Sequence, residues 1–113
     1  MMKKAAITTH ILNLDAGKPA ADVRVTLHRL DTNLPIASAT TDADGRIMQW
    51  ENNFELQAGA YLLYFAIGDW YVQQGRSSFY PEIQISFQVV NVQEHYHVPL
   101  LLNAYGYSTY RGS

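Results

Sequence analysis

Apolar and polar residues alternate with a period of two along most of this chain. The clearest example is the segment 83–89, in which Ile83, Ile85 and Phe87 alternate with glutamine and serine. Successive side chains of a β-strand point to opposite faces, so this pattern predicts a strand with one buried face. No long segment repeats apolar residues at helical spacing. The pattern therefore predicts an all-β sandwich, with strands expected at residues 6–12, 23–28, 34–41, 61–67, 83–89 and 96–102.

Three segments add detail to this pattern. Residues 61–67 are apolar on both faces, which predicts a central strand that is buried from two sides. Residues 68–75 run from one glycine to another and are long enough for about two turns of the only helix that we expect. Residues 42–45, Asp-Ala-Asp-Gly, have the composition of a tight turn, and Arg46 follows that turn directly.

The composition suits one folded domain. The chain has 113 residues, of which 48% are hydrophobic and 16% charged, so we expect a single domain over residues 1–113 with enough apolar material for one core. The basic residues are scattered and the net charge is −2, which disfavours binding to nucleic acid. Cysteine is absent, which excludes disulfides, zinc–thiolate sites and a thiol nucleophile.

The sequence shows no pattern typical of membrane insertion or export. Its longest apolar stretch, residues 60–67, is far shorter than the roughly 20 residues that a membrane-spanning helix needs. Residues 1–6 contain basic residues, as the start of a signal peptide does, but polar side chains at Thr8, Thr9 and His10 interrupt any apolar region after them. We therefore expect a soluble, cytoplasmic protein that does not associate with a membrane.

The four histidines are the first candidates for chemistry. His28 lies on the polar face of its expected strand, and we interpret it as a solvated side chain. His10 and His97 have small or apolar neighbours on their strand faces, where an imidazole needs a partner or a function. His95 and His97 are two residues apart, so they are expected to project from the face opposite Tyr96.

Other site types receive little support. His95 and His97 could form part of a metal site, but a third ligand would have to come from His10, and no cysteine or carboxylate completes a familiar spacing. The turn at residues 42–45 resembles the start of a calcium loop but lacks glycine and glutamate at the required positions. No phosphate-binding loop or nucleophile elbow is present. We therefore expect no metal and no cofactor.

Two features near the end of the expected last strand bear on the C-terminus. Pro99 has no N–H to donate, which predicts an edge strand or an irregular register. Residues 105–113 combine tyrosines, an arginine and a carboxylate, and taken alone they predict a mobile aromatic tail.

That C-terminal region, together with four shorter motifs, resembles the 5-hydroxyisourate hydrolases of the transthyretin-like family. The match covers nearly the whole chain, and the Tyr-Arg-Gly-Ser ending is its most specific part. The sequence departs from the family pattern at Asn103-Ala104, where Ser-Pro is expected, and at Asn13, where Asp is usual. Loss of the proline predicts a looser approach to the tail. The matching segments are His95-Tyr96-His97-Val98-Pro99-Leu100-Leu101-Leu102, Tyr107-Ser108-Thr109-Tyr110-Arg111-Gly112-Ser113, Thr9-His10-Ile11-Leu12, Gly17-Lys18-Pro19-Ala20, Thr41-Asp42-Ala43-Asp44-Gly45-Arg46 and Phe79-Tyr80-Pro81-Glu82-Ile83.

The resemblance implies a fold, an assembly and a reaction. The fold is a transthyretin-like sandwich of two sheets with one short helix. The assembly is a homotetramer, a dimer of dimers that pairs edge strands and encloses a channel with the active sites. The reaction is the hydrolytic opening of the ring of 5-hydroxyisourate, which gives 2-oxo-4-hydroxy-4-carboxy-5-ureidoimidazoline in urate catabolism.

The resemblance also implies the site residues. It places catalytic roles on His10, Arg46 and His97, and substrate binding on His10, Arg46, Tyr110, Arg111 and Ser113. A histidine near its ordinary pKa of about 6.5 can take a proton from water, and the arginine can stabilise an oxyanion. Which histidine is the base stays open. Two alternatives keep the sandwich without the reaction: a transthyretin-like carrier and a purely structural or adhesive protein, neither of which needs this set of side chains.

Overall fold

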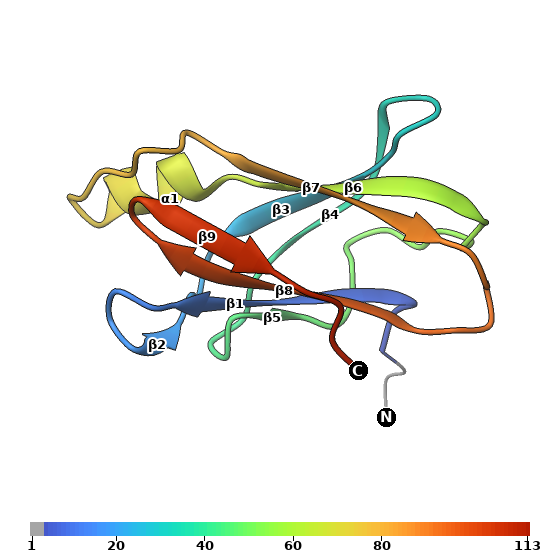
Figure 1. Cartoon of the computed structure of the whole chain (residues 1–113), viewed down its shortest axis with the longest axis horizontal. Coiled ribbons are helices and arrows are strands. Elements are labelled where there is room, and N and C mark those ends of the chain that lie inside the picture. Colours follow the sequence, from blue (N-terminus) through green and yellow to red (C-terminus); the bar gives the residue numbers. More distant parts are fainter. Residues whose placement is uncertain (1–3) are drawn as a thin grey trace.

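The structure is a computed structural model that describes residues 4–113, which form two β-sheets packed face to face, with a short helix at one end (Figure 1). The expectation about an export signal falls partly on residues 1–3, which lie outside the described residues. Within residues 4–113, no helix is long and apolar enough to cross a membrane.

The five-stranded sheet joins the strands near both ends of the chain. Its path runs β2-β1-β8-β9, and β5 pairs with β1 off this path. β1 and β8 run parallel, whereas the other pairs are antiparallel. Its strands are β1 (Ile7–Asn13), β2 (Lys18–Pro19), β5 (Arg46–Ile47), β8 (Tyr96–Asn103) and β9 (Gly106–Thr109).

The four-stranded sheet contains the middle of the chain and is antiparallel throughout, in the order β4-β3-β6-β7. Helix α1 (Ile67–Gln73) connects β6 to β7 (Figure 1). Trp70 anchors the helix, because its indole N–H donates a hydrogen bond to the carbonyl of Ala21 at 2.7 Å. The strands are β3 (Arg24–Arg29), β4 (Leu34–Thr40), β6 (Gly59–Phe65) and β7 (Ile83–Val89).

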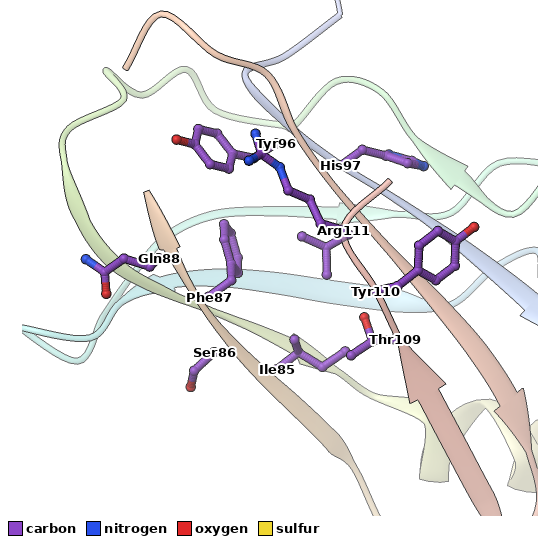
Figure 2. A pocket seen from close by; sticks show the side chains of 10 residues that line it. Ile85, Ser86, Phe87, Gln88, Tyr96, His97, Thr109, Tyr110 and Arg111 are labelled. Carbon is purple, nitrogen blue, oxygen red and sulfur yellow. The ribbon is translucent and has the colours of Figure 1, made fainter. Parts of the chain in front are cut away.

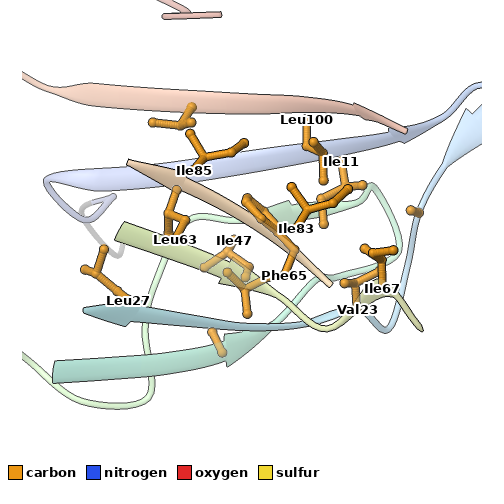
Figure 3. Close-up of a cluster of buried hydrophobic side chains, with 14 of the residues drawn as sticks. Ile11, Val23, Leu27, Ile47, Leu63, Phe65, Ile67, Ile83, Ile85 and Leu100 are labelled. Carbon is orange, nitrogen blue, oxygen red and sulfur yellow. The ribbon is translucent and has the colours of Figure 1, made fainter. Parts of the chain in front are cut away.

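The core lies between the two sheets, where all the strands except the short β2 and β9 contribute inward-facing apolar residues (Figure 3). Burying one such side chain fully stabilises the fold by about 1.5–3 kcal/mol, which offsets part of the entropy lost on folding. The largest fully buried side chains are Tyr61, Tyr71, Phe65, Ile7, Ile11, Leu27, Ile47, Leu63, Ile67, Ile83, Leu100 and Leu102.

The all-β sandwich predicted from alternation is confirmed, and so are the six expected strands, to within one or two residues at most ends. The expected helix at 68–75 is also present, but it begins one residue earlier and ends two residues earlier. The short strands β2 and β5 and the C-terminal strand β9 were not predicted. Two to four residues are too few for a period-two pattern to stand out.

The predicted burial of residues 61–67 is only half right. β6 is central, because it pairs with β3 on one side and with β7 on the other. Tyr61, Leu63 and Phe65 are fully buried, but Leu62 and Tyr64 are only half-buried. A two-layer sandwich gives each strand one inner face, so apolar residues on the second face lie at the outer surface of the sheet rather than in a second core.

Pro99 does not mark an edge strand, because β8 lies between β1 and β9. Antiparallel pairing with the C-terminal segment ends at Leu100 and Thr109 and returns as a single bridge between His97 and Gly112, in the same register. The ladder is therefore interrupted beside Pro99 and does not slip. The Thr109 hydroxyl donates a hydrogen bond to the Pro99 carbonyl at 2.7 Å and holds the two segments together there.

The interpretation of His28 as a solvated side chain is wrong. His28 is half-buried on β3, next to an irregularity in the pairing of β3 with β4. Its Nδ1 is buried and has no hydrogen-bond partner within residues 4–113. The neighbouring strands cover one edge of the ring, which alternation along β3 alone does not reveal.

Candidate active site

The outer face of the five-stranded sheet brings three of the expected site residues together. His10 on β1 pairs with Arg46 on β5, and Thr8 on β1 pairs with His97 on β8. Residues two apart on a strand share a face, and the residues between them point into the core. Strands from three distant parts of the sequence therefore place two imidazoles and a guanidinium on the same side of the sheet.

The turn before β5 fixes the position of Arg46. The Asp42 carboxylate accepts hydrogen bonds from the backbone N–H groups of Asp44 and Arg46, at 2.9 and 3.0 Å. Gly45 has a positive φ of 74°, and a Cβ at this residue would lie 2.5 Å from the carbonyl oxygen of Ile11. Only glycine fits there, so the turn predicted from the sequence brings Arg46 against β1.

His97 is held on two sides of its ring. Its Nδ1 lies 2.7 Å from the hydroxyl oxygen of Thr8, and its carbonyl accepts a hydrogen bond from the N–H of Gly112 at 2.9 Å. A Cβ on Gly112 would lie 2.6 Å from the His97 Cδ2, so the ring occupies the space that any other residue would fill. Thr8 and the C-terminal segment together fix the orientation of this imidazole.

His95 lies beside His97, as expected from their spacing, and on the face opposite the buried Tyr96. The two imidazole rings are nearly parallel, with centroids 6.5 Å apart. The Nε2 of His95 is 2.9 Å from the same Thr8 hydroxyl that binds His97. No group of three or more histidine, cysteine, aspartate or glutamate side chains within residues 4–113 is arranged to hold a metal ion.

The surroundings favour neutral imidazoles. Burial lowers the pKa of His10 below its ordinary 6.5, and the nearby Arg46 cation adds to the effect. Burial also lowers the pKa of His97, with further contributions from His95, Arg46 and His10. The neutral form of each ring is therefore favoured at neutral pH, and this is the state in which an imidazole can accept a proton.

Arg46 has an exposed side chain and belongs to none of the ion pairs within residues 4–113. Because a guanidinium keeps its charge at any physiological pH, it presents an unneutralised cation beside two neutral imidazoles. This combination can bind an anion or a polarised carbonyl and accept a proton next to it.

The C-terminal residues diverge. Tyr110 and Arg111 point in opposite directions from the segment after β9 (Figure 2). Tyr110 is half-exposed and, with His97, lines a cavity of about 330 Å³ that opens between β7 and the C-terminal segment. The guanidinium of Arg111 lies over the Tyr96 ring, 4.5 Å from its centroid, and pairs with Glu94 at 3.0 Å (Figure 2). Ser113 is exposed. Arg111 lines the same cavity as Tyr110 and His97, and its guanidinium contacts Glu94 and Tyr96.

Comparison with known proteins identifies the family. The model of the HIUase/Transthyretin family matches residues 7–112. The chain belongs to this family. A 5-hydroxyisourate hydrolase of Caulobacter vibrioides is 44% identical, over 96% of this chain and 99% of its own length. A probable 5-hydroxyisourate hydrolase of Schizosaccharomyces pombe is 40% identical, over 96% of this chain and 91% of its own length.

Solved structures of the family share the fold, which confirms the transthyretin-like sandwich. The Klebsiella pneumoniae 5-hydroxyisourate hydrolase superposes with a TM-score of 0.84 and is 38% identical, over 95% of this chain and 98% of its own. A sea bream transthyretin in complex with thyroxine gives a TM-score of 0.86 at 25% identity, over 96% and 95% of the two chains. The fold therefore does not separate hydrolases from the thyroxine-binding protein, whereas sequence identity is higher to the hydrolases.

The departure from the family pattern at Asn103-Ala104 is compensated by a hydrogen bond. The backbone N–H of Ala104, which a proline would lack, donates to the Asp15 carboxylate at 3.0 Å. The same carboxylate accepts hydrogen bonds from Tyr71 at 3.2 Å and from Arg76 at 3.1 Å, and so connects helix α1 to the turn between β8 and β9. This contact ties down the residue where the proline ring is missing, and the looser tail stays a prediction.

Sequence reasoning did not assign a role to Thr8 or Gly112. Thr8 contacts His95 and His97 only because β1 and β8 are parallel neighbours. The alternation of apolar and polar residues does not specify which strands pair. Gly112 carried a signal, since it belongs to the specific family ending. Its reason, the close approach of the His97 ring, appears only in three dimensions.

Proposed function

We propose that this protein hydrolyses 5-hydroxyisourate. The observation that carries the proposal is that the family ending and the three side chains His10, Arg46 and His97 are all retained, and that the three lie on one face with neutral imidazoles beside a free cation. The relatives named 5-hydroxyisourate hydrolase, which align over almost their whole length, support the same reaction.

In the proposed reaction, a neutral imidazole of His10 or His97 takes a proton from water while the water oxygen bonds to a ring carbonyl carbon. Arg46 donates hydrogen bonds to the resulting oxyanion, which lowers the barrier. The oxyanion then collapses and the carbon–nitrogen bond of the ring breaks. The protonated imidazole gives its proton to the departing nitrogen, which becomes part of a ureido group. The new carboxyl group loses its own proton to solvent and becomes a carboxylate.

We assign substrate binding to the five residues that the family resemblance implies, His10, Arg46, Tyr110, Arg111 and Ser113. The Tyr110 phenol extends from the segment that also holds His97, and it can hydrogen-bond a planar heterocycle. Arg111 has a second role in this proposal, because its contacts with Glu94 and Tyr96 fix the path of the tail on which Tyr110 and Ser113 are carried.

We also propose a homotetramer built as a dimer of dimers. β7 and β9 are terminal strands of their sheets, and each offers an unpaired edge to a second copy. The face with His10 and Arg46 is open in one chain, and a second pair of chains would cover it and exclude water. Sedimentation should then give four times the 12.8-kDa chain mass, and a monomer at micromolar concentration with full activity would contradict the assembly.

A carrier for a flat aromatic ligand is the second candidate, favoured by the similarity to thyroxine-bound transthyretin. A carrier needs an apolar channel but no neutral imidazoles next to an unpaired arginine. Thyroxine binding without turnover would favour this alternative.

The direct test uses purified protein and 5-hydroxyisourate generated in place by urate oxidase. The absorbance of 5-hydroxyisourate should disappear faster than its spontaneous decay, in proportion to protein concentration. An unchanged decay rate at neutral pH, with a folded tetramer present, would contradict the proposed hydrolase activity.

A further inference from the structure

The Thr8 hydroxyl lies between two imidazoles. Its oxygen is 2.7 Å from the Nδ1 of His97 and 2.9 Å from the Nε2 of His95. A hydroxyl has one proton, so when it bridges two neutral histidines it donates to one ring and accepts from the other. The proton positions on the two histidines are therefore linked through Thr8.

The backbone near His95 gives this link a direction. Burial lowers the pKa of His95 overall, but a contact with the backbone of Ala5 acts in the opposite direction, which is the effect of a carbonyl that accepts from a ring N–H. The Nε2 of His95 faces Thr8, so the nitrogen left for this contact is Nδ1. With its proton on Nδ1, His95 offers the Nε2 lone pair to the Thr8 hydroxyl, and the Thr8 oxygen then accepts from the Nδ1–H of His97.

We propose that Thr8 and His95 are positioning residues that hold neutral His97 in its Nδ1–H tautomer, with Nε2 unprotonated and open to the substrate. The Nε2 of His97 forms no hydrogen bond within residues 4–113, and it is not among the buried unpartnered atoms of that range. This inference rests on the proposed function, because it makes His97 the base that takes the proton of water.

The charges around His95 and His97 favour neutral rings. In a neutral imidazole, the tautomer decides which nitrogen can accept a proton. Burial, Lys4 and Arg111 lower the pKa of His95. Burial, His95, Arg46, His10 and Lys4 lower the pKa of His97. An imidazole with its proton on Nε2 could not act as a base at that atom, so a fixed Nδ1–H tautomer keeps the reactive nitrogen available at neutral pH.

The tautomer can be read without any assay of activity. We would label the folded wild-type protein with ¹⁵N-histidine and record long-range ¹H–¹⁵N correlations at pH 7.5, assigning peaks by single histidine substitutions. The expected result is protonation at Nδ1 in both His95 and His97. A wild-type His97 protonated at Nε2 would overturn the proposal even if the enzyme is fully active.

Two variants test the link. Thr8→Val keeps the shape of the side chain but removes the hydroxyl, and Thr8→Ser restores the hydroxyl. In Thr8→Val we expect His97 to lose its single tautomer and kcat to fall by about 10-fold or more, within the about 10²–10⁴-fold contribution of a general base, while KM changes much less. Thr8→Ser should recover both the tautomer and most of kcat. Thr26→Val, on the outer face of the other sheet, is the matched control and should change neither.

His95→Phe tests the far end of the link, with His28→Phe as its control on the other sheet. Without an acceptor at residue 95, the Thr8 hydroxyl can donate to the Nδ1 of His97, which moves the His97 proton to Nε2 and lowers kcat. An unchanged His97 tautomer in both Thr8→Val and His95→Phe, with circular dichroism like the wild type, would overturn the proposal. Loss of kcat with an unchanged tautomer would do the same, since it would point to a merely structural role.

Discussion

The outer faces of the two sheets carry similar side chains in different surroundings. Arg24 on the four-stranded sheet is paired with both carboxylate oxygens of Glu51, at 2.5 and 2.8 Å, whereas Arg46 on the five-stranded sheet has no ion pair within residues 4–113. Each face also has a half-buried histidine. Within residues 4–113, the Nδ1 of His28 is buried and has no hydrogen-bond partner, whereas the Nδ1 of His97 lies 2.7 Å from the Thr8 hydroxyl oxygen.

This difference shows that residue type and exposure do not identify a functional side chain. A cation neutralised by its own carboxylate has little left to offer a ligand, and an imidazole without a partner has no fixed tautomer. On the five-stranded sheet Arg46 belongs to none of the ion pairs of the described residues, and its surroundings favour neutral imidazoles. That arrangement is typical of a functional site.

The largest effect is expected at the histidines. His97→Asn removes the proposed base and should lower kcat/KM by about 10²–10⁴-fold. His28→Asn should leave kcat/KM unchanged, because the ring lies on the other face. Steady-state kinetics with 5-hydroxyisourate measure both. Equal losses of kcat/KM in the two variants would show that activity does not depend specifically on the outer face of the five-stranded sheet.

The two arginines give the second test. Arg46→Ala removes the donor to the oxyanion and should lower kcat by about 10²–10³-fold, with circular dichroism unchanged. Arg24→Ala breaks an exposed ion pair with Glu51 and a hydrogen bond to Thr40, both outside the proposed site, and should keep kcat. Wild-type turnover in Arg46→Ala would show that Arg46 has no role in the reaction.

Gly112→Ala should produce the third largest change. The added Cβ would lie 2.6 Å from the His97 ring and displace it. A displacement of about 1 Å at a reacting group can cost about 10²-fold in rate, so kcat should fall by about 10- to 100-fold. Gly106→Ala, where a Cβ would meet nothing within 4 Å, is the matched control. Activity equal to the control would show that the tail does not position His97.

The pH dependence should produce a smaller effect. His10 and His97 have folded-state pKa values below 6.5, so they are neutral above that pH, and kcat/KM should stay level there and fall with a midpoint below 6.5. As the pH falls, the histidines of the unfolded chain take up protons before those of the folded chain. The stability contributed by these neutral rings is therefore present above pH 6.5 and is lost as the pH falls through the lower folded-state pKa values.

Arg46→Ala should raise the pKa values of both His10 and His97 in an NMR titration. Unchanged values would show that Arg46 does not act on the imidazoles.

The smallest effect on catalysis is expected at Asp15, outside both faces. Burial raises the pKa of this carboxyl, but hydrogen bonds from Arg76, Asn103 and Tyr71 outweigh burial and hold the pKa below 3.8. Asp15→Asn should lower the melting temperature at pH 7 and leave kcat nearly unchanged. The wild-type advantage is complete above pH 3.8 and should vanish as the pH falls through the lowered pKa. A melting temperature equal to the wild type would show that Asp15 does not tie the helix to the tail.

The sequence alone determined the faces of the strands and the chemistry available. Alternation assigned inward and outward positions along six strands, and it placed His95 and His97 on the side opposite Tyr96. The turn at 42–45 could be predicted from its own residues, because hydrogen bonds from backbone N–H groups to the Asp42 carboxylate and the positive φ of Gly45 involve only sequence neighbours. The residue types of the proposed site could be predicted from the motifs that the chain shares with the family, which include His10, Arg46 and the C-terminal ending.

Only the tertiary structure decided which strands are neighbours. The parallel pairing of β1 with β8 brings Thr8 to His95 and His97 across more than 80 residues, and it makes Pro99 part of an internal strand. A period-two pattern specifies the face of each residue but not the partner of its strand, because every strand with one apolar face satisfies it equally. The partner is chosen by packing the whole chain around one core, and the site follows from that choice.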